Sequence, residues 1–295
     1  MAMKIVSALI TGLAQGAMIA LVALGYTMVY GILKLINFAH SEIFMMSAFA
    51  GLFAIVALGG VDAPLFAGVG GTLIAMVFAA ALGVLIERIA YAPLRARGRG
   101  LANTRITPLV TALGMSVLLQ NVAQLLFTAR YQGYPQLLPI QHTRKVIFIT
   151  AVLVMIGLEL LVRKTWMGKA MRALSMNVEA ARLMGIRTSR VIAITFVTGS
   201  MLAAVGAVLY CLDQSQVYPT MGVVIGTRAF VAAVIGGIGN ITGAMLGGVL
   251  IGIIGELTKL TPYSGLQDVL VFVVLIGVLL VKPTGLLGTA GIEKV

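Results

Sequence analysis

Long runs of apolar residues with few polar interruptions dominate the pattern along this chain. An α-helix rises about 1.5 Å per residue and needs about 20 residues to cross the roughly 30 Å hydrocarbon core of a bilayer. Six runs approach or exceed this length, namely residues 5–30, 36–58, 64–86, 106–127, 191–212 and 263–281. We therefore predict a membrane-spanning helix in each.

Two further regions are apolar but less regular. Residues 146–162 are near the minimum length for a span, and residues 221–257 are too long for one helix and are interrupted by a glycine-rich segment at 236–243. The second region predicts two short spans or half-helices. The fold class is therefore an all-α, polytopic transmembrane protein with about eight or nine spans, some of them short or interrupted.

Composition excludes a soluble protein. The chain has 295 residues, of which 60% are hydrophobic and only 10% charged, whereas soluble domains carry about a quarter charged residues. The loops between the spans are short, which leaves no room for a separate soluble domain. We predict one transmembrane domain over residues 1–295, and any energy-supplying domain must then lie on another chain.

The net charge of +12 is concentrated in two loops. Residues 93–105 carry only basic charges, and residues 163–190 carry seven basic residues against Glu179. Basic loops flanking apolar spans set orientation in a membrane, so this pattern predicts two cytoplasmic loops and argues against nucleic acid as a partner. Residues 129–145 and 213–220 then lie outside and the tail from residue 282 inside. Nine crossings would put the N-terminus outside. If residues 34–37 are instead a kink within a hairpin that does not fully cross, the orientation of the N-terminus stays open.

The polar residues within the spans do not indicate catalysis or ion coupling. No row of Asp, Glu or His marks a proton or sodium relay, and His40 and Glu42, two residues apart, do not share a helical face. The two histidines and the single Cys211 have no metal-ligand spacing, and the phosphate-binding loop GxxxxGK[ST] does not occur. We expect no metal, no cofactor and no enzymatic activity of the chain alone.

Glycines recur four residues apart in three places, at residues 12 and 16, 243 and 247, and 248 and 252. This spacing lets helix backbones approach closely. It predicts tight helix packing, either within the chain or in a dimer.

Two polar breaks interrupt the apolar runs, at residues 35–42 and 236–243. Paired interrupted spans in the two halves of a transporter point to its translocation path, because irregular backbone at membrane depth must be covered by protein or water. The alternative is structural: Asn37 caps the helix that follows it, and residues 236–243 form a tight turn at the membrane surface.

The longest basic loop contains a predicted short helix at residues 177–184, with Asn177 as its N-cap and Gly185 as its C-terminal stop. Its apolar side would hold Ala180, Leu183 and Met184. A short exposed helix on the inner face is suited to docking a partner. It would also suit an interfacial helix lying on anionic lipid.

Three stretches resemble the membrane-spanning permease subunits of bacterial ABC importers for branched-chain amino acids. They are Glu179-Ala180-Ala181 followed by Gly185, the sequence GILKLINFAH at 31–40, and AVIGGIGN at 233–240 continuing to Gly243. The resemblance covers nearly the whole chain. One departure is Ser41, where the family often carries glycine, so a small residue is retained there.

The resemblance implies a permease of the bacterial inner membrane that moves Leu, Ile and Val. Its implied partners are a second, related permease, two cytoplasmic ATPases, a periplasmic binding protein and the lipid bilayer. The implied ATPase-coupling residues are Glu179, Ala180, Ala181 and Gly185, and the candidate path residues at the two breaks are Asn37, Phe38, Gly237, Gly239 and Asn240.

Related permeases for urea and short amides share much of this pattern, so the substrate stays open between the two groups. An ion-coupled secondary transporter and a passive channel are the alternatives from other classes. The sparse carboxylates within the spans argue against the first, and the docking loop would be unexplained in the second.

Overall fold

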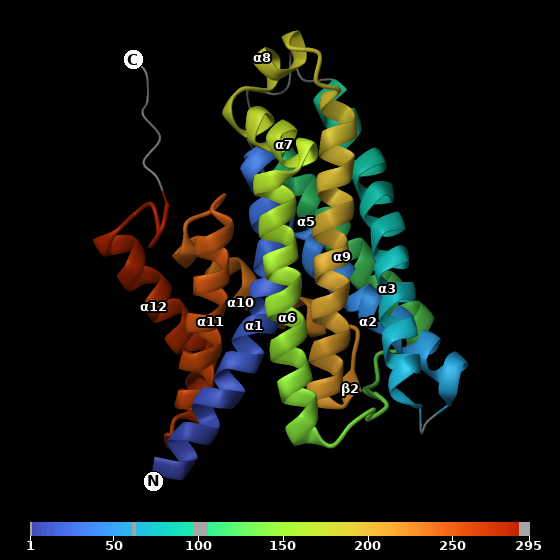
Figure 1. Cartoon of the computed structure of the whole chain (residues 1–295), viewed down its shortest axis with the longest axis vertical. Helices are drawn as coiled ribbons and strands as arrows, with labels where there is room; N and C mark the ends of the chain where they lie inside the picture. The colour runs from blue at the N-terminus through green and yellow to red at the C-terminus, as the bar shows by residue number, and fades with distance from the viewer. Residues whose placement is uncertain (1, 61–62, 97–105, 289–295) are drawn as a thin grey trace.

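The computed structural model describes residues 2–60, 63–96 and 106–288. Nearly all of them are helical (Figure 1). The helices are α1 (Ala2–Leu33), α2 (Ala39–Gly59), α3 (Leu65–Ile86), α4 (Ala92–Ala96), α5 (Ile106–Phe127), α6 (Ile140–Lys164), α7 (Trp166–Met176), α8 (Val178–Leu183), α9 (Thr188–Gln214), α10 (Met221–Gly236), α11 (Ile241–Thr258) and α12 (Gln267–Val281). A π-helical segment (Glu87–Tyr91), a 3₁₀ turn (Ser264–Leu266) and two short strands, β1 (Gln132–Gly133) and β2 (Gln216–Val217), complete the list.

The predicted fold class is confirmed. Within the described residues, eight helices are long and apolar enough to cross a membrane, and the apolar helix α10 is shorter, with 16 residues. The apolar region at 221–257 therefore forms two helices, α10 and α11, as its length predicted. Helix α6, at 25 residues, is longer than the apolar run from which it was predicted, because polar residues extend it at both ends.

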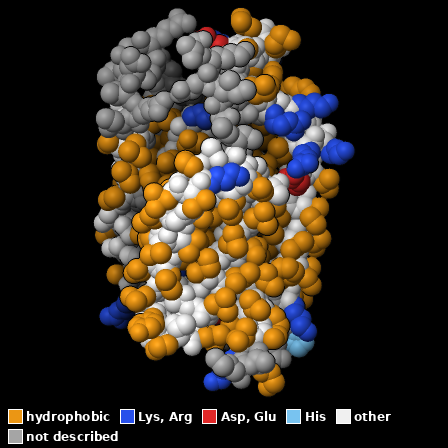
Figure 2. Space-filling view, turned by 90° about the vertical axis from the view of Figure 1, so that its left-hand side faces the viewer, with side chains coloured by type: hydrophobic (Ala, Val, Ile, Leu, Met, Phe, Trp, Pro, Cys, Tyr) orange, Lys and Arg blue, Asp and Glu red, His pale blue; other side chains and the backbone are white. Residues whose placement is uncertain are grey.

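The helices form an inner and an outer group. Helices α1, α2, α9, α10 and α11 are largely buried by their neighbours, whereas α3, α5, α6 and α12 expose most of their apolar side chains. Only Val271 is buried on α12, and the face that carries this helix is mostly hydrophobic, with Lys and Arg towards its ends (Figure 2). Such a surface suits lipid or another membrane protein rather than water.

The glycine spacing is used inside the chain. A Cβ atom on Gly252 of α11 would lie 2.3 Å from Cα of Gly16 on α1, and one on Gly248 would lie 2.5 Å from Cα of Ala20. Gly12 lies in the same way against Ile253. The backbones of α1 and α11 are therefore in direct contact, and these glycines serve internal packing.

Two ends of the bundle are distinct. Helices α7 and α8 lie at one end, and α1 begins at the other (Figure 1). At this second end β1 pairs antiparallel with β2, joining Gln132 to Val217 and Gly133 to Gln216. The two loops predicted to lie outside are thus paired with each other, opposite the predicted cytoplasmic loop at 163–190. Arg97, Arg99 and Arg105 belong to the other predicted cytoplasmic loop, residues 93–105, and lie outside the described residues.

Candidate functional site

The loop at 163–190 is held firmly against the bundle. Thr165 caps α7 by accepting a hydrogen bond from the backbone N–H of Gly168 at 3.1 Å. A Cβ atom on Gly168 would lie 2.0 Å from the carbonyl oxygen of Val162, so only glycine fits where α7 folds back on α6. The guanidinium of Arg172 also donates to that carbonyl. Helix α7 contacts α1, α6 and α9, so a displacement of the loop would be passed directly to three helices.

Helix α8 has the two ends that the sequence predicted. The side-chain oxygen of Asn177 accepts a hydrogen bond from the N–H of Ala180 at 3.0 Å, which is an N-cap. At the other end Gly185 adopts φ +81°, its N–H donates to Arg182 and the N–H of Ile186 donates to Ala181. This pair of bonds is a Schellman motif, which favours glycine because other residues rarely adopt positive φ.

The outer side of the loop is an exposed apolar surface. Met176, Leu183 and Met184 are more than 80% exposed, whereas Ala181 is buried. Glu179 and Ala180 are exposed on the same short helix. Large apolar side chains this exposed at the end of the bundle indicate contact with another molecule. We name Met176, Glu179, Ala180, Leu183 and Met184 the docking surface.

The first break is held by a residue far away in the sequence. Helix α1 ends at Leu33, Lys34 adopts φ +55°, and the chain then runs through a short non-helical segment to α2. Asn37 is buried, and its side-chain oxygen accepts a hydrogen bond from the hydroxyl of Tyr91 at 2.9 Å. Tyr91 ends the π-helical segment that follows α3. Such segments occur often at functional sites, because they re-aim side chains within a helix.

The start of α2 buries several polar groups. Glu42 is fully buried, and one carboxylate oxygen accepts weak hydrogen bonds from Ser41 at 3.4 Å and from Ser116 of α5 at 3.2 Å. The other oxygen of Glu42, Nε2 of His40 and Nδ2 of Asn37 have no hydrogen-bond partner within the described residues. No ion pair to Glu42 is found in the same ranges. Buried polar atoms without partners are uncommon and call for an explanation.

Helix α10 closes over this polar region. A Cβ atom on Gly222 would lie 2.6 Å from the backbone oxygen of Ser41, and one on Gly226 would lie 2.3 Å from the Ser41 Cβ. The rings of Phe38 and Phe230 are 5.9 Å apart. The first break is thus packed directly against α10, a helix that begins about 180 residues later in the sequence.

The second break is a compact turn that is held by several hydrogen bonds. Gly237 and Gly239 have φ of +102° and +97°. The side-chain oxygen of Asn240 caps α11 through the N–H of Gly243, and its amide nitrogen donates to the carbonyl of Leu287 at 2.7 Å. The backbone N–H groups of Leu286 and Leu287 donate to Ile235 and Gly236. The segment after α12 therefore completes the hydrogen bonding of the turn.

The two breaks lie next to each other. A Cβ atom on Gly31, near the end of α1, would lie 3.8 Å from Cα of Gly239. A space of only about 10 Å³, lined by aromatic and aliphatic side chains that include Tyr26, Tyr30 and Phe230, remains between α1, the first break and α10. Of the candidate path residues, Phe38 packs against Phe230 of α10 and Gly239 lies against Gly31 of α1. The coupling candidates Glu179, Ala180, Ala181 and Gly185 lie together on the loop at 163–190, apart from both breaks.

Several residues of this region were not identified from the sequence. Tyr91 and Ser116 look ordinary in their own segments, and only the fold brings them to Asn37 and Glu42. The spacing of Gly222 and Gly226 was an available signal, because it matches the other glycine pairs. No group of three or more metal-ligating side chains occurs within the described ranges.

Comparison with known proteins identifies the family. Residues 8–279 match the model of the branched-chain amino acid transport system / permease component. The chain is 39% identical to the high-affinity branched-chain amino acid transport system permease protein BraD of Pseudomonas aeruginosa, over 97% of each chain. It is 40% identical to the corresponding LivH protein of Escherichia coli, over 96% of each chain. It is also 32% identical to a probable LivH of Methanocaldococcus jannaschii, over 46% of this chain and 45% of that one. No solved structure matches the chain.

These matches cover the loop at 163–190 and both breaks, and they confirm the family that the three sequence stretches indicated. These relatives are named as permease proteins of transport systems, so the expected class, a transport subunit, is confirmed. The chain belongs to the family of permease components of branched-chain amino acid transport systems.

Proposed function

We propose that this chain is a permease subunit that moves leucine, isoleucine and valine across the bacterial inner membrane, driven by separate ATPase subunits. A second, related permease and a periplasmic binding protein would complete the system. Family membership and near-full-length similarity to BraD and LivH support the substrate class. The whole of residues 1–295 would act as one transmembrane domain.

The docking surface carries the proposal of ATP-driven transport. Its apolar side chains are exposed on a helix with both ends capped, and α7 fixes that helix against α1, α6 and α9. A partner that moved α8 would therefore move the helices that surround the two breaks. We assign Glu179, Ala180, Ala181 and Gly185 to this coupling, with Ala181 as the buried anchor and Gly185 as the turn that positions α8.

The coupling proposal is tested by reconstituting the permease with its partner ATPases and binding protein and measuring ATP-dependent uptake of labelled leucine. Gly185→Pro removes an N–H donor and forbids positive φ, so uptake should fall to background. Gly185→Asn is the matched control, because asparagine tolerates the left-handed conformation, and it should retain most uptake. Glu179→Lys should also abolish uptake while the permease stays in the membrane. Normal uptake by both Gly185→Pro and Glu179→Lys would refute the docking assignment.

We further propose that the two breaks form the translocation path. Asn37 and Phe38 would lie in the part whose contacts change during transport, and Gly237, Gly239 and Asn240 would form its fixed wall. The polar atoms of Asn37, His40 and Glu42 that have no hydrogen-bond partner within the described residues support this role. The second carboxylate oxygen of Glu42 faces Gly222 of α10, whereas Nε2 of His40 faces Gly25 of α1. These atoms would offer hydrogen bonds to the ammonium and carboxylate of an amino acid once the helices that cover them separate. In the present arrangement Phe38 and Phe230 close that space.

Competition experiments in the same reconstituted system test the substrate. Isoleucine should suppress uptake of labelled leucine, and urea at the same concentration should not. Suppression by urea instead would assign the chain to amide transport. Leucine movement by this chain alone, without ATPases, would replace the importer proposal with a carrier or channel.

A further inference from the structure

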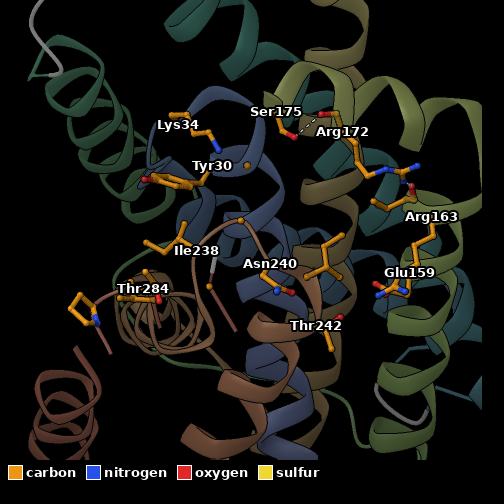
Figure 3. A pocket seen from close by; sticks show the side chains of 17 residues that line it. Tyr30, Lys34, Glu159, Arg163, Arg172, Ser175, Ile238, Asn240, Thr242 and Thr284 are labelled. Carbon is orange, nitrogen blue, oxygen red and sulfur yellow. Dashed lines mark hydrogen bonds and ion pairs between the residues drawn. The ribbon is translucent and has the colours of Figure 1, made fainter. Parts of the chain in front are cut away.

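A cavity of about 710 Å³ opens at the end of the molecule that carries α7 and α8. Its walls come from the end of α1, from α6 and α7, from the turn between α10 and α11, and from the segment after α12. Figure 3 shows Lys34 on one side, Arg163 and Arg172 on the other, and Asn240 and Thr242 between them. Pockets of this size bind small molecules or headgroups.

The charges around this cavity are mainly positive. Among the described residues that line it, three are cations, Lys34, Arg163 and Arg172, and one is a carboxylate, Glu159, which gives these residues a net charge of +2. Glu159 is occupied by an ion pair with Arg163. The side chain of Lys34 has no ion pair or hydrogen bond within the described residues, and its Nζ lies 6.0 Å from the centre of the Tyr30 ring. Arg172 uses part of its guanidinium on the Val162 carbonyl and keeps further donors free.

Polar groups that suit an anion complete the site. The N-terminus of the 18-residue helix α11 lies at the cavity through Asn240, Ile241 and Thr242, and a helix N-terminus carries a partial positive charge. The hydroxyls of Ser175, Thr242 and Thr284 are also on its walls. The lining includes apolar side chains as well, namely Val162, Val234, Ile238 and Ile241. A ligand with an anionic head and an apolar body would match both parts.

We propose that this cavity binds a phosphate-bearing anion, supplied by the headgroup of an acidic phospholipid. Basic pockets between transmembrane helices at the cytoplasmic surface recognise such headgroups. The positive charge of the surrounding loops places this end of the molecule on that side. A bound headgroup would tie together the end of α1, the α6–α7 corner and the α10–α11 turn.

The test measures the thermal unfolding midpoint of the purified full chain in phosphatidylcholine nanodiscs with increasing phosphatidylglycerol. A ligand that binds the folded state raises this midpoint as its concentration increases. The midpoint should rise with phosphatidylglycerol and not with added phosphatidylcholine. Each of Lys34→Gln and Arg172→Gln should weaken the apparent affinity about fivefold, since one basic residue near an anionic surface contributes about 1 kcal/mol.

Two further variants make the test specific. Lys169→Gln removes the same charge from the exposed side of α7, outside the cavity, and should leave the affinity unchanged. Glu159→Gln removes the one carboxylate among the described lining residues and should strengthen binding, which a merely structural role of Glu159 would not do. The side chain of Lys34 makes no hydrogen bond within the described residues, so Lys34→Gln should remain folded even if Arg172→Gln does not.

Inorganic phosphate separates the two sources of the anion. If inorganic phosphate without phosphatidylglycerol raises the unfolding midpoint by the same amount, and Lys34→Gln abolishes that rise, the cavity is a phosphate site. Its ligand is then free phosphate rather than a lipid headgroup. An equal response of wild type, Lys34→Gln and Lys169→Gln to phosphatidylglycerol would overturn the site. Displacement of the lipid by leucine but not by phosphate would also overturn it, because the cavity would then belong to the substrate path.

Discussion

The two interrupted spans differ in how their polar groups are satisfied. At the second break, Gly237 and Gly239 adopt the positive φ angles of the turn, and Asn240 caps α11. The backbone N–H groups after α12 donate to the carbonyls at the end of α10. At the first break the side chains of Asn37, His40 and Glu42 each keep an atom without a hydrogen-bond partner within the described residues, and the hydrogen bonds from other helices come from Tyr91 and Ser116. Both were predicted from the same kind of sequence signal.

This difference separates a rigid turn from a site that can change its partners. Backbone hydrogen bonds within the second break are lost only if the turn unfolds. The side-chain contacts at the first break join three helices and can be exchanged when one of them moves. A movable α10, packed on Ser41 through Gly222 and Gly226, would alter the first break and leave the second intact.

The largest effect is expected from Gly236→Val at the second break. A Cβ atom there would lie 2.1 Å from the backbone oxygen of Gly243, and backbone on both sides cannot yield. We expect a loss of more than about 3 kcal/mol of stability and little monodisperse protein, at the upper end of overpacking costs. Size-exclusion chromatography and thermal unfolding measure this. Gly157→Val, where a side chain meets open space on α6, is the control and should behave as wild type.

Asn37→Leu at the first break should affect transport more than folding. Uptake of leucine is expected to fall at least tenfold, roughly the loss that a missing contact of about 1.4 kcal/mol produces. The variant leaves the Tyr91 hydroxyl unpaired, which costs about 1 to 3 kcal/mol of stability.

The double variant Asn37→Leu with Tyr91→Phe separates the two effects. Removing both partners of a buried hydrogen bond is close to neutral, so the unfolding midpoint should return towards wild type while uptake stays low. Recovery of uptake together with stability would mean that Asn37 only supports the fold, and the contrast between the breaks would disappear.

A smaller effect is expected from Asn240→Leu. The change removes the N-cap of α11 and the bond to Leu287, and loss of a cap typically costs about 1 kcal/mol. Thermal unfolding should show the loss, and uptake per folded molecule should also decrease, because Asn240 is proposed to form part of the wall of the path. Uptake per folded molecule at the wild-type rate would identify the second break as a turn alone. A specific decrease would make it part of the path.

The smallest effect is expected from Ser116→Ala. Its hydroxyl donates to Glu42 at 3.2 Å, and a hydrogen bond between helices within a membrane is worth about 0.6 kcal/mol on average. A shift of the unfolding midpoint at the limit of detection is expected, with uptake reduced less than twofold. A change as large as that of Asn37→Leu would show that Glu42 depends on this one contact.

The sequence predicts the local features of this molecule well. The ends of α8 follow from Asn177 and Gly185 alone, because an N-cap and a C-terminal glycine act within one helical turn. The close contact of α1 and α11 is also encoded in glycine spacing, although the spacing does not say which helices meet. The number of long apolar helices follows from the apolar runs, whereas polar residues extend α6 beyond its run.

What the sequence does not predict are contacts between distant segments. Nothing in the residues near Asn37 indicates that Tyr91 will reach it, since the π-helical segment that turns Tyr91 has no glycine or proline to mark it. The hydrogen bonding of the second break depends on the backbone N–H groups of Leu286 and Leu287, about 50 residues later. The cavity with Lys34, Arg163 and Arg172 likewise draws on segments whose separate charge patterns only indicate orientation.

The contact between Gly16 and Gly252 limits how this sequence can diverge. Most buried contacts can drift over evolutionary time, because a larger residue on one side is balanced by a smaller one on the other. Here each partner is already the smallest residue, and a side chain at either position would overlap the backbone opposite. Relatives that keep α1 against α11 are therefore expected to keep both glycines while the lipid-facing residues of α12 change freely.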